Sequence, residues 1–275
     1  MPPSITVVGS INFDIAVRCE RIPDPGETIT DAESSGGPGG KGGNQAVAAS
    51  LLGARVRLLG MVGDDIYADQ VLHMLDGYGV DIAGVEQTKA GTGLAVVLVT
   101  ADGENRIIVD RGANALLEAL DVRGANAVLC QLEIPVETVV EAARQCRGYF
   151  CLNAAPACPV PSEVLERADL VVVNRYELEA LASIPRLVAL TLGEEGAILL
   201  EEGREVARVR PPKVEAVDGT AAGDAFTACL LVSILEGVER EQALYRACIA
   251  GAIAASREGA QASLPWRHEI DALAS

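Results

Sequence analysis

The chain has 275 residues, of which 49% are apolar and only 3% aromatic, so it can bury a large core of Ala, Val, Leu and Ile. Its composition excludes a disordered chain and a coiled coil, and its formal net charge of −17 disfavours nucleic acid and anionic membranes as partners. Seven cysteines without a CxxC pair and two distant histidines, His73 and His268, indicate reduced thiols rather than a zinc site or a histidine triad. The sequence shows no signal-peptide pattern and no apolar run long enough to span a bilayer, which predicts a cytoplasmic protein.

Short β-rich runs alternate with helical patterns along almost the whole chain. In chain order, strands are expected at residues 5–8, 55–59, 127–131, 149–153, 170–174, 187–192 and 197–200. Helices are expected at residues 43–52, 66–78, 136–145, 161–167, 176–182, 223–236 and 239–257. This alternation predicts an α/β fold in a single domain over residues 1–275, with a three-layer, mostly parallel sheet and helices on both faces.

Two segments interrupt the alternation and predict a second, smaller sheet. Residues 15–33 carry Pro23, Pro25 and Gly26 between two extended pieces. Residues 94–100 and 105–110 have the pattern of a β-hairpin around a turn at residues 101–104. Such small pieces cannot bury a core of their own. We therefore expect a β-sheet lid, formed by segments at about 13–35 and 93–110, that covers a ligand or a partner subunit.

The strongest local signal is a run of small residues that leads into an apolar helix, DGTAAGDAF at residues 218–226. Small residues let the backbone approach a ligand, and the first N–H groups of a helix attract phosphate oxygens. A carboxylate here, that of Asp224, can accept a proton from a hydroxyl that attacks phosphorus. Asp is also a preferred N-cap residue of helices, so the run alone does not decide between a catalytic and a structural role for Asp224.

A second glycine-rich run, GGPGGKGGNQ at residues 36–45, opens the first long helix. It is not a Walker A loop, because Gly42 follows Lys41 where Ser or Thr is required and no strand is expected directly before it. Lys41 and Asn44 are donors suited to sugar hydroxyls or a phosphate. Asn12 and Asp14, which follow the first strand, can hydrogen-bond vicinal hydroxyls, although Asn and Asp also favour plain turns.

Polar side chains also follow the carboxyl ends of the later expected strands. They are Glu133, Asn153, Asn174 with Glu177, and Thr191. Because the carboxyl ends of parallel strands meet at one edge of a sheet, these residues are expected to share one site with Asn12 and Asp14.

Four motifs together resemble the ribokinase-like family of carbohydrate and nucleoside kinases. They are GGKGGNQAVA at residues 39–48, GAN at 112–114, AAGD at 221–224 and GAQASLPW at 259–266, and the similarity runs from Val7 to about Ala272. The resemblance implies a mostly parallel sheet flanked by helices and a small β lid that closes over the sugar and forms a homodimer contact. It further implies ATP-dependent phosphorylation of a pentose, with Mg²⁺ and a monovalent cation, most naturally K⁺, as cofactors.

The resemblance also implies a role for individual residues. Those that would bind the pentose are Asn12, Asp14, Gly40, Lys41, Asn44 and Glu133. Asp224 would be the general base toward the 5-hydroxyl, with an anion hole formed by Ala221, Ala222 and Gly223. Asn174 and Glu177 would organise phosphates and Mg²⁺ through water, and the nucleotide groove would include Thr191, Gly193, Gly196, Gly223 and Cys248. The K⁺ loop would comprise Asp218, Thr220, Ala254, Arg257, Gly259 and Ser263.

Some positions depart from the family's pattern. The segment from Asn174 to Thr191 is much shorter than usual and leaves room for about two helical turns, which puts the nucleotide side in question. Gly219 replaces a usual Thr, and Cys248 stands where a His or Asn commonly contacts the adenine side, so that contact is expected to be weaker. On this resemblance, the leading hypothesis is that the substrate is D-ribose. The alternatives are deoxyribose, a ketohexose, a nucleoside, or a sugar-binding relative that has lost catalysis, whereas a Rossmann oxidoreductase lacks its glycine fingerprint.

Overall fold

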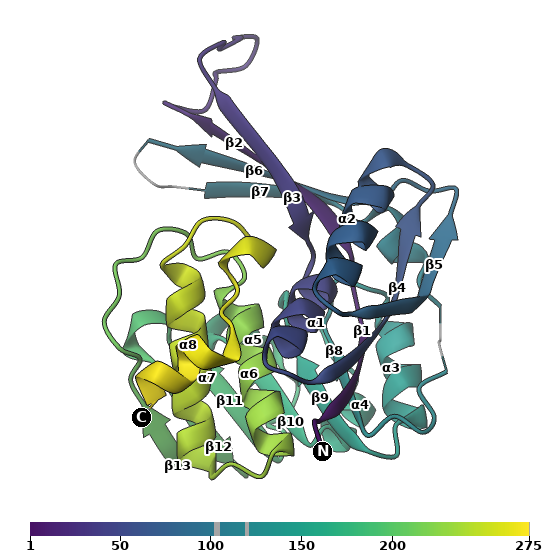
Figure 1. The fold of residues 1–275 in the computed structure, drawn as a ribbon, viewed down its shortest axis with the longest axis vertical. Coiled ribbons are helices and arrows are strands. Elements are labelled where there is room, and N and C mark those ends of the chain that lie inside the picture. Colours follow the sequence, from purple (N-terminus) through teal and green to yellow (C-terminus); the bar gives the residue numbers. More distant parts are fainter. Residues whose placement is uncertain (102–104, 119–120, 275) are drawn as a thin grey trace.

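The computed structural model describes residues 1–101, 105–118 and 121–274, and these residues form a large and a small β-sheet (Figure 1). The nine strands of the large sheet are, in spatial order, β13 (Arg204–Val209), β12 (Ala197–Glu201), β11 (Leu187–Thr191), β10 (Leu170–Val173), β9 (Tyr149–Asn153), β8 (Ala127–Cys130), β1 (Ser4–Val8), β4 (Arg55–Gly63) and β5 (Asp81–Thr88). Neighbours from β5 to β11 are parallel, and β12 and β13 continue antiparallel. The expected mostly parallel sheet is confirmed.

The order of these strands reverses between β1 and β8. From β1 the chain builds outward through β4 and β5 on one side, and from β8 through β9, β10 and β11 on the other. In open α/β sheets such a reversal leaves a crevice beyond the carboxyl ends of the two strands, and ligands bind there. Residues that follow β1 and β8 are therefore positioned at the mouth of one crevice.

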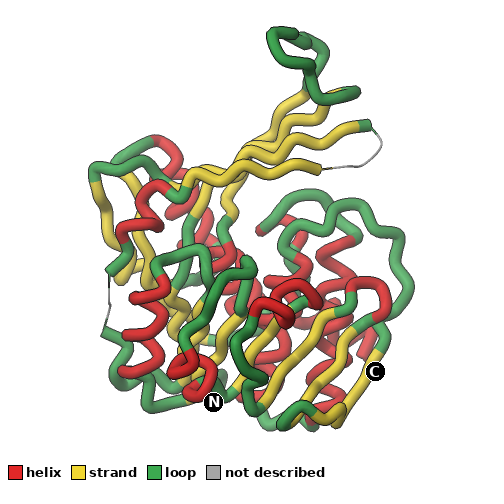
Figure 2. The backbone as a smooth tube through the Cα atoms, turned by 180° about the vertical axis from the view of Figure 1, so that it is seen from behind, coloured by secondary structure: helices red, strands yellow, loops and turns green. Residues whose placement is uncertain are grey.

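Helices cover both faces of the large sheet (Figure 2). On one face lie α1 (Lys41–Leu51), α2 (Ile66–Gly77), α6 (Ala222–Leu235), α7 (Arg240–Ala255) and α8 (Arg267–Ala274), and on the other α3 (Val136–Gln145), α4 (Ser162–Arg167) and α5 (Arg175–Ala180). Side chains alternate along each strand, so Val7 packs into the first core and Val8 into the second. This double burial explains the continuous apolar runs of the inner strands.

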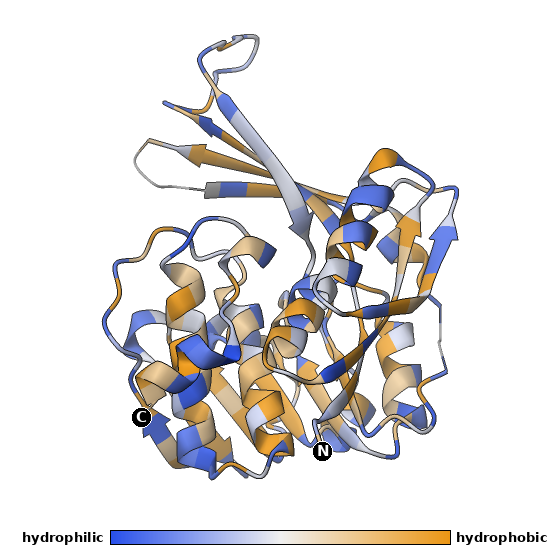
Figure 3. Ribbon diagram, in the orientation of Figure 1, coloured by the Kyte–Doolittle hydropathy of each residue, from blue (hydrophilic) through white to orange (hydrophobic). Residues whose placement is uncertain are grey.

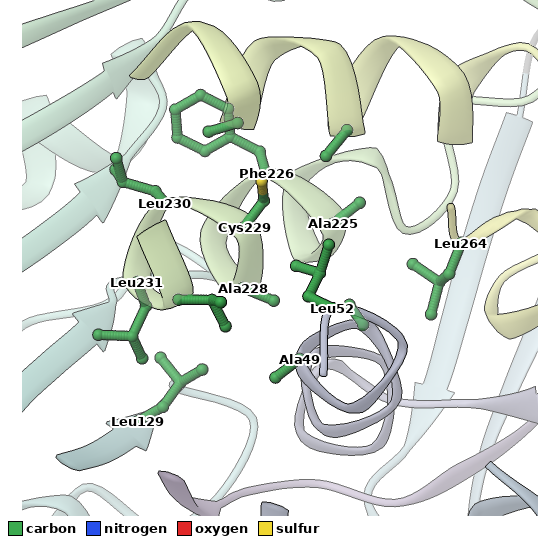
Figure 4. Close-up of a cluster of buried hydrophobic side chains, with 14 of the residues drawn as sticks. Ala49, Leu52, Leu129, Ala225, Phe226, Ala228, Cys229, Leu230, Leu231 and Leu264 are labelled. Atoms are coloured by element: carbon green, nitrogen blue, oxygen red, sulfur yellow. The ribbon is translucent and has the colours of Figure 1, made fainter. Parts of the chain in front are cut away.

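The close contact of α6 with α1 brings two helix N-termini together. Ala49 of α1 lies opposite Ala225 and Ala228 of α6, whereas Phe226 points toward α7 (Figure 4). Small side chains allow helix axes to approach, and α6 can be apolar on all sides because it is buried between its neighbours. As a result, the first turns of α1 and α6 open onto the same crevice.

The small sheet projects from the body of the protein (Figures 1 and 2). Its strands are, in spatial order, β3 (Glu33–Gly39), β2 (Asn12–Cys19), β6 (Gly93–Thr100) and β7 (Asn105–Asp110). β6 and β7 form the expected antiparallel hairpin and are rich in apolar residues (Figure 3), while turn residues 102–104 lie outside the described residues. The sequence therefore predicted a separate small sheet correctly.

The strand β3 corrects one expectation, because it runs directly into α1. The sequence predicts no strand directly before the glycine-rich run, but in the structure Gly36, Gly37 and Gly39 pair with β2. Glycine disfavours strands in general. Here, however, a Cβ at Gly39 would collide with the carboxylate of Asp14, so this position needs a residue without a side chain.

The connection between β10 and β11 is short, as expected. It contains α5, which covers six residues, followed by a loop to Leu187. The remaining short elements are the 3₁₀ helices η1 (Gly112–Leu116), η2 (Gly193–Glu195) and η3 (Gln261–Ser263). Within the described ranges, no helix combines the length and apolar character that crossing a membrane requires.

Candidate active site

One cavity of about 450 Å³ lies at the carboxyl edge of the large sheet and is covered by the small sheet. That volume is typical of sites for small ligands. The predicted residues that line it are Asn12, Asp14, Gly40, Lys41, Asn44, Glu133, Asn153, Asn174, Glu177, Thr191, Thr220, Ala221, Gly223 and Asp224. Segments far apart in the sequence therefore converge on the crevice that the strand order creates.

Asp224 lies in the first turn of α6 and is 5% exposed. Its Oδ2 accepts a hydrogen bond from Nδ2 of Asn44 at 2.9 Å, and its Oδ1 accepts one from Nε2 of Gln45 at 2.8 Å. Burial raises the pKa of Asp224, and the ammonium group of Lys41 and the two amides partly oppose this rise. A carboxylate with a raised pKa that faces a cavity is suited to accept a proton.

Lys41 lies among several acidic side chains at the start of α1. Burial alone would lower the pKa of this lysine, but the carboxylates of Asp224, Glu133, Glu177 and Asp14 together raise it. The ammonium group is therefore held in its charged form. It supplies positive charge to the cavity of a protein whose overall charge is strongly negative.

Asp14 is another carboxyl group of the cavity whose pKa is strongly raised. Burial, followed by repulsion from Glu133 and Asp224, raises its pKa to about 7, against a weaker opposing effect of Lys41. Its buried Oδ1 has no hydrogen-bond partner in the protein. An unpartnered buried acceptor that lines a cavity is suited to bind a ligand donor such as a sugar hydroxyl.

Hydrogen bonds fix the other polar side chains of this end of the cavity. Oε2 of Glu133 accepts bonds from Oγ of Ser10 at 2.6 Å and from the backbone N–H of Lys41 at 2.9 Å. Oδ1 of Asn12 accepts a bond from Nδ2 of Asn114 at 2.8 Å. These contacts connect the loops after β1 and β8 with the start of α1, and β2 with η1, so the polar surface of the cavity is preorganised.

The segment before α6 presents backbone groups to the cavity. Ala221 has a left-handed conformation, with φ of 60°, and turns the chain into the first N–H groups of the helix. A Cβ at Gly219 or Gly223 would meet no atom within 4 Å, so space is open beside this N-terminus. Such a site attracts anions because its N–H groups lack partners inside the helix.

Asn174 and Glu177 form the opposite end of the cavity. They make a capping box at the start of α5, with 2.9 Å from the Glu177 N–H to Oδ1 of Asn174 and 2.7 Å from the Asn174 N–H to Oε2 of Glu177. Burial raises the pKa of Glu177, against the backbone hydrogen bond and Lys41. The cavity is thus lined by Asp224, by the polar residues around Asp14 and by the polar pair Asn174 and Glu177.

The match to known families decides the class of enzyme. A model of the pfkB family of carbohydrate kinases matches residues 2–267. The chain belongs to this family. Bacillus subtilis ribokinase is 37% identical to it, with 99% of both chains aligned. Salmonella typhi deoxyribokinase is 32% identical, with 95% of both chains aligned. The solved structure of Arabidopsis thaliana ribokinase with ribose and ATP is 32% identical, has a TM-score of 0.91 and covers 100% of this chain and 99% of that chain.

As a pfkB-family carbohydrate kinase, the protein is a phosphotransferase that transfers a phosphoryl group to a hydroxyl group of a sugar. Some predicted residues nevertheless lie outside the cavity lining. Gly193 is the first residue of η2, Gly196 follows that helix, and Ala222 is the first residue of α6. Cys248 lies in α7 and is 6% exposed, and burial, followed by the nearby Cys229, raises the pKa of its thiol to about 12. A buried, protonated thiol with apolar neighbours offers little to an adenine ring.

The residues predicted to bind K⁺ gather at the carboxyl end of α7, beside Thr220. Asp218 accepts hydrogen bonds from Oγ1 of Thr220 at 2.6 Å and from the N–H of Gly259 at 3.0 Å. The N–H groups of Val217 and Asp218 donate to the carbonyl of Ala255. The guanidinium group of Arg257 pairs with Glu269, so this residue would take part in the loop through its backbone.

Sequence reasoning missed several residues that complete the site. Gln45 lies behind Asp224, where it joins that carboxylate to the predicted residue Asn153, and Asn114 orients Asn12. The small sheet contributes apolar cavity-lining residues, namely Ala95, Val97, Ile107 and Val109. Their every-second-residue spacing marks one face of the predicted hairpin, so the sequence did contain a signal for these four.

Proposed function

We propose that the protein phosphorylates D-ribose at its 5-hydroxyl with ATP, giving ribose 5-phosphate and ADP. The observation that carries this proposal is the buried Asp224 carboxylate, which lies between a hydroxyl-binding end of the cavity and the open N-terminus of α6. The similarity to a ribokinase solved with ribose and ATP supports the same pairing of substrates.

In this proposal Asp224 accepts the proton of the 5-hydroxyl while the hydroxyl oxygen forms a bond to the γ-phosphorus of ATP. The bond from that phosphorus to the β,γ-bridging oxygen breaks, and ADP leaves. Backbone N–H groups of Ala221, Ala222 and Gly223 stabilise the negative charge on the transferred group. Asn12, Asp14, Gly40, Lys41, Asn44 and Glu133 bind the sugar hydroxyls.

The nucleotide would extend from the α6 N-terminus toward Asn174, Glu177 and Thr191. The carboxylate of Glu177 and the amide of Asn174 fit a Mg²⁺ ion held mainly by ATP phosphates and reached through water, because hard cations prefer oxygen ligands. Mg²⁺ would neutralise phosphate charge. Gly193, Gly196 and Cys248 remain proposed neighbours of the groove, with Cys248 giving the weakest contact.

The loop of Asp218, Thr220, Ala254, Arg257, Gly259 and Ser263 fits a monovalent cation. Its donor set combines one carboxylate, the fully buried Ser263 hydroxyl and several backbone carbonyls, all of them oxygen ligands. Bound K⁺ would stabilise the loop next to Thr220 and hence the backbone of the anion hole.

We further propose that the small sheet is a lid and a homodimer contact, and that the enzyme is cytoplasmic. The lid role is supported by the four apolar residues that β6 and β7 place in the cavity wall. The dimer role is supported by the outer edge strand β7, on which Ile107, Ile108 and Val109 are exposed.

Deoxyribose is the second candidate, because a deoxyribokinase is among the relatives at 32% identity. The test is an ADP-release assay with ribose, 2-deoxyribose, a ketohexose and a nucleoside, each with and without K⁺. We expect the highest kcat/KM with ribose and stimulation by K⁺. A clear preference for a nucleoside would contradict the proposal, and no aromatic ring stands among the described cavity-lining residues to stack on a base.

A further inference from the structure

A chain of buried amide side chains ends at Asp224. Gln45 and Gln131 are fully buried, and Asn153 is 7% exposed. Nε2 of Gln45 donates to Oδ1 of Asp224 and to Oδ1 of Asn153, both at 2.8 Å. Oε1 of Gln45 accepts a bond from Nε2 of Gln131 at 2.6 Å. Gln45 lies behind Asp224 and is not a cavity-lining residue, so it does not touch the substrate.

The polarity of this chain is fixed at the backbone. Nδ2 of Asn153 donates to the carbonyl oxygen of Val172 at 3.2 Å, and a carbonyl can only accept. Oδ1 of Asn153 must therefore face Gln45 as an acceptor. Gln45 in turn presents its NH₂ group to Asn153 and Asp224 and its oxygen to Gln131. Both N–H bonds of Gln45 are used, so the amide cannot flip without losing three contacts.

This arrangement selects one form of Asp224. Its two oxygens each receive one amide N–H, from Gln45 and from Asn44, and these donors favour the ionised carboxylate. A protonated Asp224 carboxyl would be a weaker acceptor for these two N–H groups than the carboxylate is. The same two bonds fix the plane of the carboxylate and leave its remaining lone pairs for the sugar hydroxyl.

We propose that Gln45 is a positioning residue that keeps the Asp224 carboxylate ionised and correctly oriented, with Asn153 and Gln131 holding Gln45 in turn. This inference rests on the proposed role of Asp224 as the base, and it does not depend on which sugar is the substrate. A purely structural role for Gln45 would predict lost stability with the chemistry of the remaining folded enzyme unchanged.

The readout must separate Asp224 from the other charged groups around it. These are Lys41 of α1, Glu133 after β8 and Asp14 of β2, which surround the carboxylate from three elements. The pH profile of kcat at saturating sugar is the suitable measurement, because it reports groups in the substrate complex, where Asp14 is occupied by the sugar.

The main variant is Gln45→Met, which keeps size and removes both donors. We expect kcat to fall about 10- to 100-fold, as for a lost hydrogen bond to a charged group, with KM for the sugar changed by less than about threefold. The acid limb of the kcat profile should move to higher pH, because an amide that favoured the carboxylate is gone. Gln45→Glu should move it further, since it adds a negative charge beside Asp224.

The matched control is Thr138→Val in α3, which also removes a buried side-chain donor, to the carbonyl of Leu117, but has no link to Asp224. It should lower the unfolding temperature and leave the pH profile unchanged. If Gln45→Met does not fold, Gln131→Met gives the same readout one bond further from Asp224, with a smaller shift in the same direction.

The outcomes separate this inference from the proposed function. If folded Gln45 or Gln131 variants have the same kcat as the wild-type enzyme, and the acid limb of their kcat profile lies at the same pH, the positioning role is overturned and the kinase proposal stays intact. Wild-type enzyme that phosphorylates a different sugar would overturn the ribose assignment, and the same profiles would then be measured with that sugar.

Discussion

Replacing Asp14 by Asn tests whether the buried charge of this cavity residue destabilises the unliganded protein. The pKa of Asp14 rises from 3.8 to about 7 through burial and the nearby carboxylates of Glu133 and Asp224. Because the folded-state pKa exceeds the unfolded one, ionising Asp14 costs the unliganded fold free energy. Stability from this group is therefore complete below about pH 4, falls as pH rises, and is lost above about pH 7. The shift corresponds to roughly 4 kcal/mol in order of magnitude.

We therefore expect Asp14→Asn to raise the free energy of unfolding at pH 8 by up to about 4 kcal/mol relative to wild type, with little difference at pH 4. The same variant should raise KM for ribose, because an unpartnered carboxylate oxygen is lost from the cavity. Urea unfolding at both pH values, with Asp31→Asn on the exposed β2–β3 loop as control, measures the first effect. Equal destabilisation of wild type and variant between pH 4 and pH 8 would refute the reasoning.

Three further variants test separate parts of the site. Ala221→Gly should raise the free energy of unfolding in urea by up to about 1 kcal/mol, because Ala221 has φ of 60°; a loss of stability would contradict this. Asp218→Asn should reduce the ratio of activities with and without K⁺, since Asp218 holds Thr220 and Gly259 together, and an unchanged ratio would argue against the cation loop. Val97→Asp should raise KM for ribose about tenfold or more and leave KM for ATP unchanged, because it adds a charge to the lid side of the cavity. Unaltered ribose KM would mean that the small sheet does not cover the sugar.

The inner part of the fold could be predicted because its residues are buried on both faces. β9 and α3 have the expected bounds, and β8 and β10 differ from them by one residue. The edge of the large sheet could not be predicted in the same way. Most residues of β5 and β13 are exposed or half-buried, and half of the residues in each strand are polar, so their sequences lack a strong apolar pattern. The helix α8, which begins right after Pro265 and Trp266, is not among the helices expected from the sequence.

In the site, too, some residues could be predicted from the local sequence, whereas others depend on tertiary packing. Asn12, Asp14, Glu133 and Asn174 follow strands, and parallel strands must bring their carboxyl ends to one edge, so their meeting could be predicted. The contact of Gln45 with Asn153, 108 residues away, depends on how α1 packs against α6 and β9. No local pattern encodes that packing. The unexpected strand β3 has the same origin, because Gly39 is explained by the side chain of Asp14 and Gly36 by the ring of Phe13, both on the neighbouring strand β2.

The most direct test of the account is the Asp224→Asn variant, assayed for ribose binding by calorimetry and for turnover by ADP release. The account predicts that ribose binding is kept and that kcat falls roughly a hundredfold to ten-thousandfold, as for loss of a general base. Turnover equal to that of wild type would show that the buried carboxylate at the start of α6 does not accept the hydroxyl proton.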